Sequence, residues 1–447
     1  MLHYKLLMRA MKLQDRFYQL LLCPLFLVPI LIGISSSLAF AQKDSGFTNK
    51  AEAQNMLRDT VKIGRWMEYM DSSMHITLDT NAPYYSLVIY KEGKPTGIFR
   101  AYYRNGKLYF TCPCSKGEKN GMGKKYYENG VLKSEIPYVK GEVIGIWKEY
   151  YPDGKLMGEA PYLDGSENGL AKAYYESGKV RSEAQYRNGR EEGMEIGYYE
   201  SGKILDSVPC LDNKKNGIVK VFFENGNKMF ELPFIRGHIE GIRKEYYETG
   251  KIRWEISYKN DSVDGSVKEF YAASGKLYGE ATFVNGKKSG IGKNFYEDGK
   301  LQGEANYVNG KETGLAKNYY ENGTLQSEAT FDNGKKNGVE KYYYPDGTLQ
   351  QETNYINDTP NGVVKSYYKD GKLSLETPYV NGKKNGVEKE YYTDGTVKSE
   401  TPYTDDKING MEQYFYSNGK LKSETPYKNG VISGPFKEYD TNGSEVK

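Results

Sequence analysis

The chain has 447 residues and is rich in glycine and tyrosine, with 50 and 43 of them, while only 38% of its residues are hydrophobic. It carries 62 lysine and arginine residues against 59 aspartate and glutamate residues, which gives a formal net charge of +3. This composition fits an ordinary globular domain poorly. The near-neutral balance also argues against a nucleic-acid-binding protein, which needs an excess of positive charge on one face.

Residues 1–41 are typical of an export signal rather than of folded structure. Basic residues between 5 and 16 precede an apolar run, Leu20–Ile34, and small residues then lead to Ala39-Phe40-Ala41. The run is shorter than the about 20 residues that a membrane-spanning helix needs. We therefore expect cleavage near Ala41 and an exported protein, located in the periplasm, the outer envelope or the extracellular medium. A retained membrane anchor is the alternative.

The next two segments lead into the repetitive part of the chain. Residues 42–63 are polar, and we expect them to form a disordered or weakly helical lead-in. Residues 64–96 begin with Gly64-Arg-Trp66, which echoes Gly145-Ile-Trp147 further along the chain. We interpret 64–96 as a diverged repeat with a longer loop near Pro83, since terminal repeats are often atypical because they cap the stack.

Residues 97–447 consist of one 24-residue unit written fifteen times, which predicts a repeat architecture. The first glycine of the unit is called position 0, and it recurs at residues 97, 121, 145, 169, 193, 217, 241, 265, 290, 314, 338, 362, 386, 410 and 434. Only the step from 265 to 290 is longer, by one residue.

Two turn signals occur in each unit, so each unit is expected to form one β-hairpin followed by a second turn. Position 9 is glycine in every copy, usually after asparagine or aspartate, which is the signature of a two-residue type I′ turn. Position 20 is glycine in most copies. Its replacements are residues that tolerate a left-handed backbone, namely Asn213, Asp261, Asp358 and Asp406.

A two-residue loop at positions 8 and 9 fixes the predicted register of the hairpin: position 6 faces 11, position 5 faces 12 and position 3 faces 14. Position 3 is lysine or arginine and position 14 is glutamate in nearly every copy. The predicted register therefore places a cation opposite a carboxylate, a cross-strand pair that contributes about 0.2–1 kcal/mol.

Aromatic and aliphatic residues dominate positions 6, 11 and 17, and period-2 alternation predicts that they share one face, which would be the core. The opposite face would carry the Lys/Glu pairs and the tyrosines of position 5. Because tyrosine suits half-wet surfaces, these tyrosines form the candidate binding surface. They are Tyr126, Tyr150, Tyr174, Tyr198, Tyr246, Tyr319, Tyr343, Tyr367 and Tyr391.

These patterns predict an all-β fold: an elongated, single-layer antiparallel β-meander of tandem 24-residue β-hairpins, in which each unit contacts mainly its neighbours. The last copy stops part-way through its second strand, soon after Gly443. An unfinished hairpin leaves an open sheet edge, so end-to-end self-association of chains is a further expectation to be tested.

The sequence shows no catalytic constellation, and we expect no enzyme, no cofactor and no metal site. The three histidines are His3, His75 and His238. None of them has a second residue at the spacing that a metal site or a catalytic triad needs. The cysteines after the signal, Cys112, Cys114 and Cys210, are expected to be small buried residues. A strained redox pair or a metal site at Cys112-Pro-Cys114 is the alternative.

The repeated phrase Gly-x-x-Lys-x-Tyr-Tyr, with its turn glycines and glutamate, as at Gly386 to Lys407, resembles the bacterial variant of the MORN repeat. The resemblance covers about 97–447 and extends to residue 64 through the diverged copy. It implies scaffolding, self-association or membrane-proximal placement. Similar proteins are often labelled as the antitoxin component of a toxin–antitoxin module, and with an export signal such a role implies an exported target.

The sequence repeats one unit many times and shows no unique site. We therefore hypothesise that the protein is a non-enzymatic, exported scaffold that binds a protein partner, and an immunity-like role is one version of this hypothesis. The alternative is a cell-envelope protein whose position-5 tyrosines stack on glycan rings or lie at lipid head groups.

Overall fold

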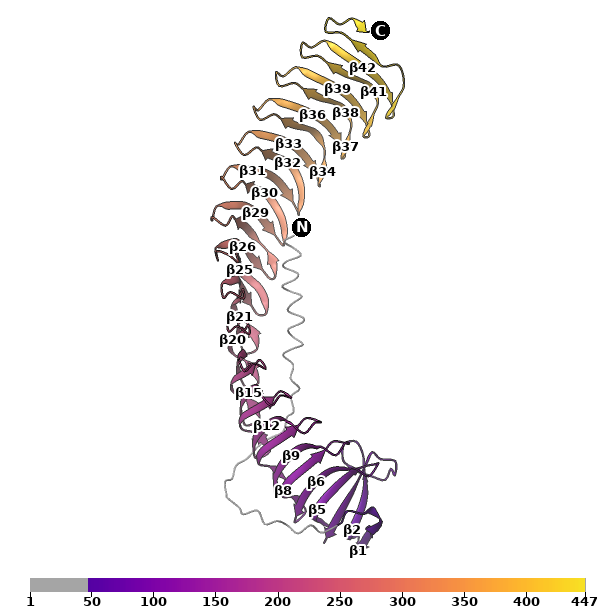
Figure 1. The fold of residues 1–447 in the computed structure, drawn as a ribbon, viewed down its shortest axis with the longest axis vertical. Helices are drawn as coiled ribbons and strands as arrows, with labels where there is room; N and C mark the ends of the chain where they lie inside the picture. The colour runs from indigo at the N-terminus through magenta and orange to yellow at the C-terminus, as the bar shows by residue number, and fades with distance from the viewer. Residues whose placement is uncertain (1–46, 447) are drawn as a thin grey trace. The chain divides into compact units, whose positions relative to one another are not determined.

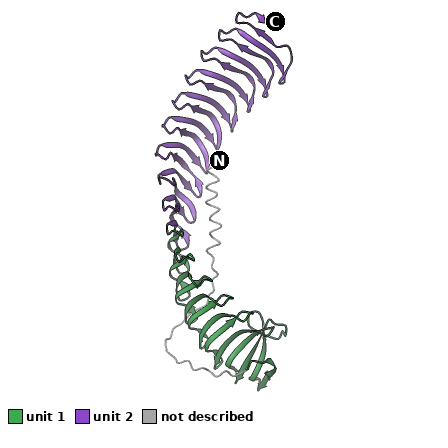
Figure 2. Ribbon diagram, in the orientation of Figure 1, with its two compact units in different colours: residues 1–226 green, residues 227–447 purple. Residues whose placement is uncertain are grey.

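The computed structural model describes residues 47–446, so the predicted export signal lies outside the described residues. The described chain contains 45 β-strands and one short 3-10 helix, η1 (Lys50–Glu52). No helix in this range is long and apolar enough to cross a membrane. The chain forms two compact units, and the boundary between them lies between Gly226 and Asn227 (Figure 2). Within each unit, successive hairpins lie side by side (Figure 1).

The strands of the first unit are β1 (Met56–Arg58), β2 (Val61–Met70), β3 (Ile76–Thr77), β4 (Tyr84–Lys91), β5 (Lys94–Tyr103), β6 (Leu108–Ser115), β7 (Glu118–Lys119), β8 (Gly121–Tyr126), β9 (Leu132–Val139), β10 (Glu142–Val143), β11 (Gly145–Tyr150), β12 (Leu156–Leu163), β13 (Ser166–Glu167), β14 (Gly169–Tyr174), β15 (Val180–Arg187), β16 (Arg190–Glu191), β17 (Gly193–Tyr198), β18 (Ile204–Leu211), β19 (Lys214–Lys215) and β20 (Gly217–Phe222).

The strands of the second unit are β21 (Lys228–Ile235), β22 (His238–Ile239), β23 (Gly241–Tyr246), β24 (Ile252–Lys259), β25 (Ser262–Phe270), β26 (Leu277–Val284), β27 (Lys287–Lys288), β28 (Gly290–Phe295), β29 (Leu301–Val308), β30 (Lys311–Tyr319), β31 (Leu325–Asp332), β32 (Lys335–Tyr343), β33 (Leu349–Ile356), β34 (Thr359–Pro360), β35 (Gly362–Tyr367), β36 (Leu373–Val380), β37 (Lys383–Lys384), β38 (Gly386–Tyr391), β39 (Val397–Thr404), β40 (Lys407–Ile408), β41 (Gly410–Phe415), β42 (Leu421–Lys428), β43 (Val431–Ile432), β44 (Lys437–Tyr439) and β45 (Glu445–Val446).

The first described residues fold onto the start of the sheet. Within the lead-in, β1 pairs with β2, and Phe47 is almost fully buried. Residues 64–96 contain the β2–β4 pair, in which Gly64 lies opposite Tyr90. Positions 0 and 17 of a regular copy pair in the same way, as Gly386 does with Tyr403.

The middle of each regular hairpin has the predicted register. Lys389 pairs with Glu400, and Lys341 pairs with Glu352, so position 3 faces position 14. Every strand pairing that the structure gives is antiparallel. Each long strand pairs with the long strands before and after it in the chain, as β38 does with β36 and β39. The predicted fold class, an all-β antiparallel meander of tandem hairpins, is confirmed.

The first turn differs from the prediction. The N–H of Gly347 donates to the carbonyl of Tyr344, whose own N–H donates to the carbonyl of Thr348, and Gly347 has φ +92°. The loop therefore has three residues, a type I turn followed by a left-handed glycine, and the predicted two-residue type I′ turn is wrong here. A bulge at Gln350 then restores the register, since Tyr343 pairs with Leu349 and Tyr342 with Gln351.

The type I′ turn occurs instead at the second turn. There Asn333 and Gly334 have φ +50° and +83°, and the flanking residues Asp332 and Lys335 pair with each other. The four non-glycine residues at position 20 also have positive φ, as predicted: Asn213, Asp261, Asp358 and Asp406.

The bulge redistributes side chains between the two faces. Directly paired residues share a face, so one face, the charged face, carries positions 1, 3, 5, 11, 14 and 16, whereas the inner face carries positions 2, 4, 13, 15 and 17. The prediction that positions 11 and 17 lie on one face is therefore wrong. Most buried side chains of the regular copies lie on the inner face, as Ser399 and Thr401 do at positions 13 and 15.

Candidate binding surface

Most copies carry two adjacent tyrosines, at positions 5 and 6, which link neighbouring hairpins in opposite directions. The hydroxyl of Tyr391, at position 5, donates to Glu376 of the preceding hairpin at 2.8 Å. The hydroxyl of Tyr392, at position 6, donates to the carbonyl of Phe415 in the following hairpin, also at 2.8 Å. These side-chain bonds run between hairpins in addition to the backbone ladder, which explains why both positions are tyrosine.

All nine tyrosines of the predicted surface are half-buried, and the structure places them on the charged face. In seven of them the hydroxyl donates to the position-14 glutamate of the preceding hairpin: Tyr150, Tyr174, Tyr198, Tyr246, Tyr343, Tyr367 and Tyr391. In Tyr126 and Tyr319 the backbone carbonyl accepts a bond from a position-6 hydroxyl. What these residues offer to a ligand is therefore mainly the ring.

The bonds to glutamate also change how these phenols titrate. Burial, followed by the hydrogen bond to the glutamate, raises the pKa of Tyr343, Tyr367 and Tyr391 to about 12. Another position-14 glutamate, Glu183, accepts from Tyr198 and also forms an ion pair with Lys172 at position 3, at 2.7 Å. Position 14 can thus be a shared acceptor for a lysine and a tyrosine.

The structure reveals a row of exposed aliphatic side chains that the sequence analysis missed. These residues occupy position 1 on the charged face, and their exposed fractions run from 41% at Met411 to 58% at Ile291. This aliphatic row consists of Met122, Ile146, Leu170, Met194 and Ile218 in the first unit and Ile242, Ile291, Leu315, Val339, Val363, Val387 and Met411 in the second. Its sequence signal is the residue that directly follows each position-0 glycine.

Prolines extend the apolar character of the row. Val363, Val387 and Met411 each pair with a proline at position 16, namely Pro378, Pro402 and Pro426. These prolines also abut the next hairpin, because a Cβ added to Gly386 would lie 2.8 Å from Cγ of Pro378. The last three members of the row are consequently flanked by rigid apolar residues, whereas Leu315 and Val339 pair with Thr330 and Asn354.

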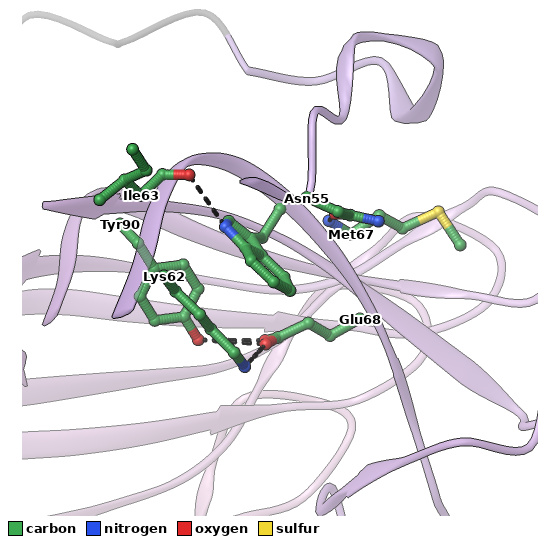
Figure 3. Close-up of polar contacts among 7 residues, drawn as sticks. Asn55, Lys62, Ile63, Met67, Glu68 and Tyr90 are labelled. Carbon is green, nitrogen blue, oxygen red and sulfur yellow. Dashed lines mark hydrogen bonds and ion pairs between the residues drawn. The ribbon is translucent and has the colours of Figure 1, made fainter. Parts of the chain in front are cut away.

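The inner face has a different chemistry. Lysines at position 22 lie over the position-17 tyrosine of the next hairpin, with Nζ 4.7 Å from the ring centre for Lys384 and Tyr403. Lys384 also pairs with Glu388 at 2.6 Å. Figure 3 shows the counterpart at the start of the chain, where Lys62 and the hydroxyl of Tyr90 both contact Glu68. In the second unit a polar hollow of about 340 Å³ lies on this face, lined by small residues such as Gly303 and Ala316.

One stretch of the inner face is acidic. Burial, followed by the charges of Glu191 and Asp206, raises the pKa of Glu195 to about 7, against the opposing effect of Lys215. The carboxylate of Asp206 accepts the N–H of Gly197 at 3.0 Å. Among residues 47–446 no group of three or more histidine, cysteine, aspartate or glutamate residues could hold a metal ion.

The described histidines form isolated surface pairs. Nδ1 of His238 lies 2.8 Å from Asp261, and that of His75 lies 3.8 Å from Asp71. Cys112 and Cys114 are buried as predicted, whereas Cys210 is partly exposed, and all three are free thiols.

The fold and its repeated surfaces show that this chain is a tandem β-hairpin repeat protein. The model of the MORN repeat variant matches twelve segments: 95–113, 119–140, 144–164, 167–188, 215–236, 239–260, 288–309, 312–333, 336–357, 360–381, 384–405 and 408–429. These segments cover more than half of the chain, which therefore belongs to the MORN repeat variant family. No curated protein matches the chain.

The chain is also similar to segments of much larger solved structures. It matches "Crystal Structure of TcdB2-TccC3-Cdc42" at 10% identity and a TM-score of 0.13, over 84% of this chain and 30% of that chain. It matches "Crystal Structure of TcdB2-TccC3" at 10% identity and a TM-score of 0.11, over 86% and 34%. It thus spans only about a third of those chains, and TM-scores this low do not support a shared fold.

Proposed function

We propose that this chain is a non-enzymatic, exported scaffold that binds a protein partner through the aliphatic row. The row is the observation that carries the proposal. Single exposed hydrophobic residues are normal on a protein surface, whereas contiguous apolar surface marks an interaction site. Here aliphatic side chains recur in successive copies, two strands or about 10 Å apart.

The surroundings of the row favour a protein as the partner. The row lies beside the Lys/Glu pairs of positions 3 and 14, which would form a polar rim around an apolar centre, the usual composition of a protein–protein interface. The expected partner presents its own aliphatic side chains along an extended surface. An immunity-like role, in which the partner is an exported toxin, is one form of this proposal.

Affinity capture with paired variants tests the proposal. The tagged full chain is cross-linked in its own cells, and co-purifying material is identified by mass spectrometry. The row variant carries Leu315→Thr, Val339→Thr, Val363→Thr and Val387→Thr, which place β-branched side chains suited to a strand at all four positions but remove apolar surface. A matched variant replaces Tyr319, Tyr343, Tyr367 and Tyr391 with serine in the same copies.

The two variants separate the candidate functions. A stoichiometric protein that is captured by the wild type and the tyrosine variant but lost with the row variant supports the proposal. Capture that is unchanged by the row variant contradicts it.

Envelope binding is the second candidate, and the half-exposed tyrosine rings favour it, because the bonds to glutamate hold them in fixed orientations. Loss of glycan or lipid from the tyrosine variant alone supports that function.

A further inference from the structure

Two buried cysteines lie close together on strand β6 of the first unit. Cys112 is 0% exposed and Cys114 is 5% exposed, and both are free thiols. They occupy positions 15 and 17, so both side chains point to the inner face. In the other copies position 15 is a small or aliphatic residue, and position 17 is aromatic in all but the copy with Cys210. The residue between the two cysteines, Pro113, belongs to the opposite face.

Sulfur, aromatic and cationic groups surround the pair. Cys112 belongs to a buried cluster with Met70 of strand β2, which is 7% exposed, and Met74 packs against the same cluster. Lys119 lies alongside, with Nζ 4.9 Å from the ring centre of Tyr138. Burial raises the pKa of both thiols, that of Cys112 to about 12, while the charge of Lys119 acts in the opposite direction.

We propose that Cys112 and Cys114 form a binding site for one soft monovalent metal ion, of the copper(I) type. Soft thiolate and thioether ligands select such ions. Two thiolates suffice for an ion of low coordination number, so the site needs no third histidine, cysteine or carboxylate.

The spacing of the cysteines favours an ion over a disulfide. Residues i and i+2 of a strand are about 6.6–6.8 Å apart and their side chains run parallel. A disulfide needs Cβ atoms only about 3.5–4.5 Å apart, so it would strain strand β6. An ion held between the two sulfurs bridges a wider gap, because each sulfur contributes a separate bond.

Charge and proton balance fit this chemistry. Binding replaces the two S–H protons, which leave to solvent, by two metal–sulfur bonds, and neither the metal nor the sulfur changes oxidation state. The resulting bis-thiolate complex of a monovalent ion carries one negative charge, which the adjacent Lys119 offsets.

Anaerobic titration of the reduced full chain with copper(I), against a colorimetric chelator, tests the site. We expect one tightly held copper(I) per chain, with X-ray absorption showing sulfur neighbours only. Cys112→Ala and Cys114→Ala should each abolish this tight equivalent. Cys210→Ala is the matched control and should retain it.

Each remaining outcome overturns the proposal. If the wild-type chain takes no copper(I) from the chelator, the proposed site does not exist. Retention of the tight equivalent by both Cys112→Ala and Cys114→Ala places it elsewhere, and circular dichroism of each variant shows that the sheet is intact. Oxidation of the pair to an intrastrand disulfide under mild conditions, with no copper(I) uptake after re-reduction, identifies a redox pair instead.

Discussion

At the scale of single residues, the position-0 glycines show what the turn chemistry demands. Gly386 has φ +124°, and an added Cβ would lie 2.8 Å from Cγ of Pro378. Gly290 has φ +79° and open space around it. We expect Gly386→Ala to lower the free energy of unfolding by about 1–3 kcal/mol, because both backbone strain and a clash result. Gly290→Ala should cost only about 1 kcal/mol from its left-handed backbone.

Urea unfolding of both glycine variants, followed by circular dichroism, checks this prediction. Equal losses for Gly386→Ala and Gly290→Ala would show that the contact with Pro378 contributes nothing.

Glu195 provides a prediction for pH. Its pKa in the folded chain, about 7, lies above the ordinary value of 4.5. A raised pKa means that the contribution of this group to stability is complete below about pH 4.5 and is lost as the pH rises through 7. We therefore expect Glu195→Gln to be more stable than the wild type at pH 8, by about 1–2 kcal/mol, and equal to it at pH 4.5.

Thermal unfolding of Glu195→Gln and the wild type at the two pH values measures this difference. Glu176→Gln, at an exposed turn residue, is the control. A stability gain of Glu195→Gln that is the same at pH 4.5 and pH 8 would refute the electrostatic explanation.

At the scale of the hairpin, the sequence predicts the middle of the ladder but not its end. The Lys389–Glu400 pairing follows correctly from the turn glycine because two deviations cancel: the loop is one residue longer than predicted, and one residue bulges out of the second strand. Asn-Gly or Asp-Gly suits both a type I′ turn and a type I turn followed by a left-handed glycine. Pro152 and Pro345 at position 7 favour the second type, since proline suits the first central residue of a type I turn.

The candidate surface was only partly recognised from the sequence, for a reason separate from the bulge. Alternation places the tyrosines of position 5 and the residues of position 1 on the same face as the lysines of position 3. The aliphatic row was missed because its side chains look like core residues in the sequence, and only the structure shows that Val387 is exposed.

The two turn types respond differently to glycine. Asn381, in a type I′ turn, has φ +49°, so Asn381→Gly should change the stability by less than about 0.5 kcal/mol. Asp394 lies in a first turn, where its Oδ1 accepts from the N–H and the hydroxyl of Thr396 at 2.8 and 2.6 Å. Asp394→Gly removes these bonds and should cost about 1 kcal/mol. Urea midpoints that rank the two variants in the opposite order would contradict the assigned turns.

At the scale of the whole molecule, each hairpin interacts with the hairpin before it and the one after it. Strand β36 pairs with β35 and β38, and the tyrosines of positions 5 and 6 reach only to the adjacent copies. Stability of such a protein is a sum of repeat terms and nearest-neighbour terms. A whole repeat should therefore be removable, provided that the alternation of strand directions is kept.

Deleting residues 362–385 tests this. The deletion removes one complete 24-residue copy and joins Asn361 to Gly386, so that β33 can pair with β38 as it pairs with β35 in the wild type. We expect an unchanged circular dichroism spectrum per residue and a urea dependence of unfolding that falls by roughly a tenth for the second unit, in proportion to the surface lost. Deleting only residues 362–373 removes β35 and its turn, so that β36 would have to pair with β33 in place of β35 and Glu352 would lose Lys365, the residue opposite it in the wild type. That variant should lose the second unit's cooperative unfolding, whereas equal behaviour of the two deletions would mean that the hairpin is not the unit of stability.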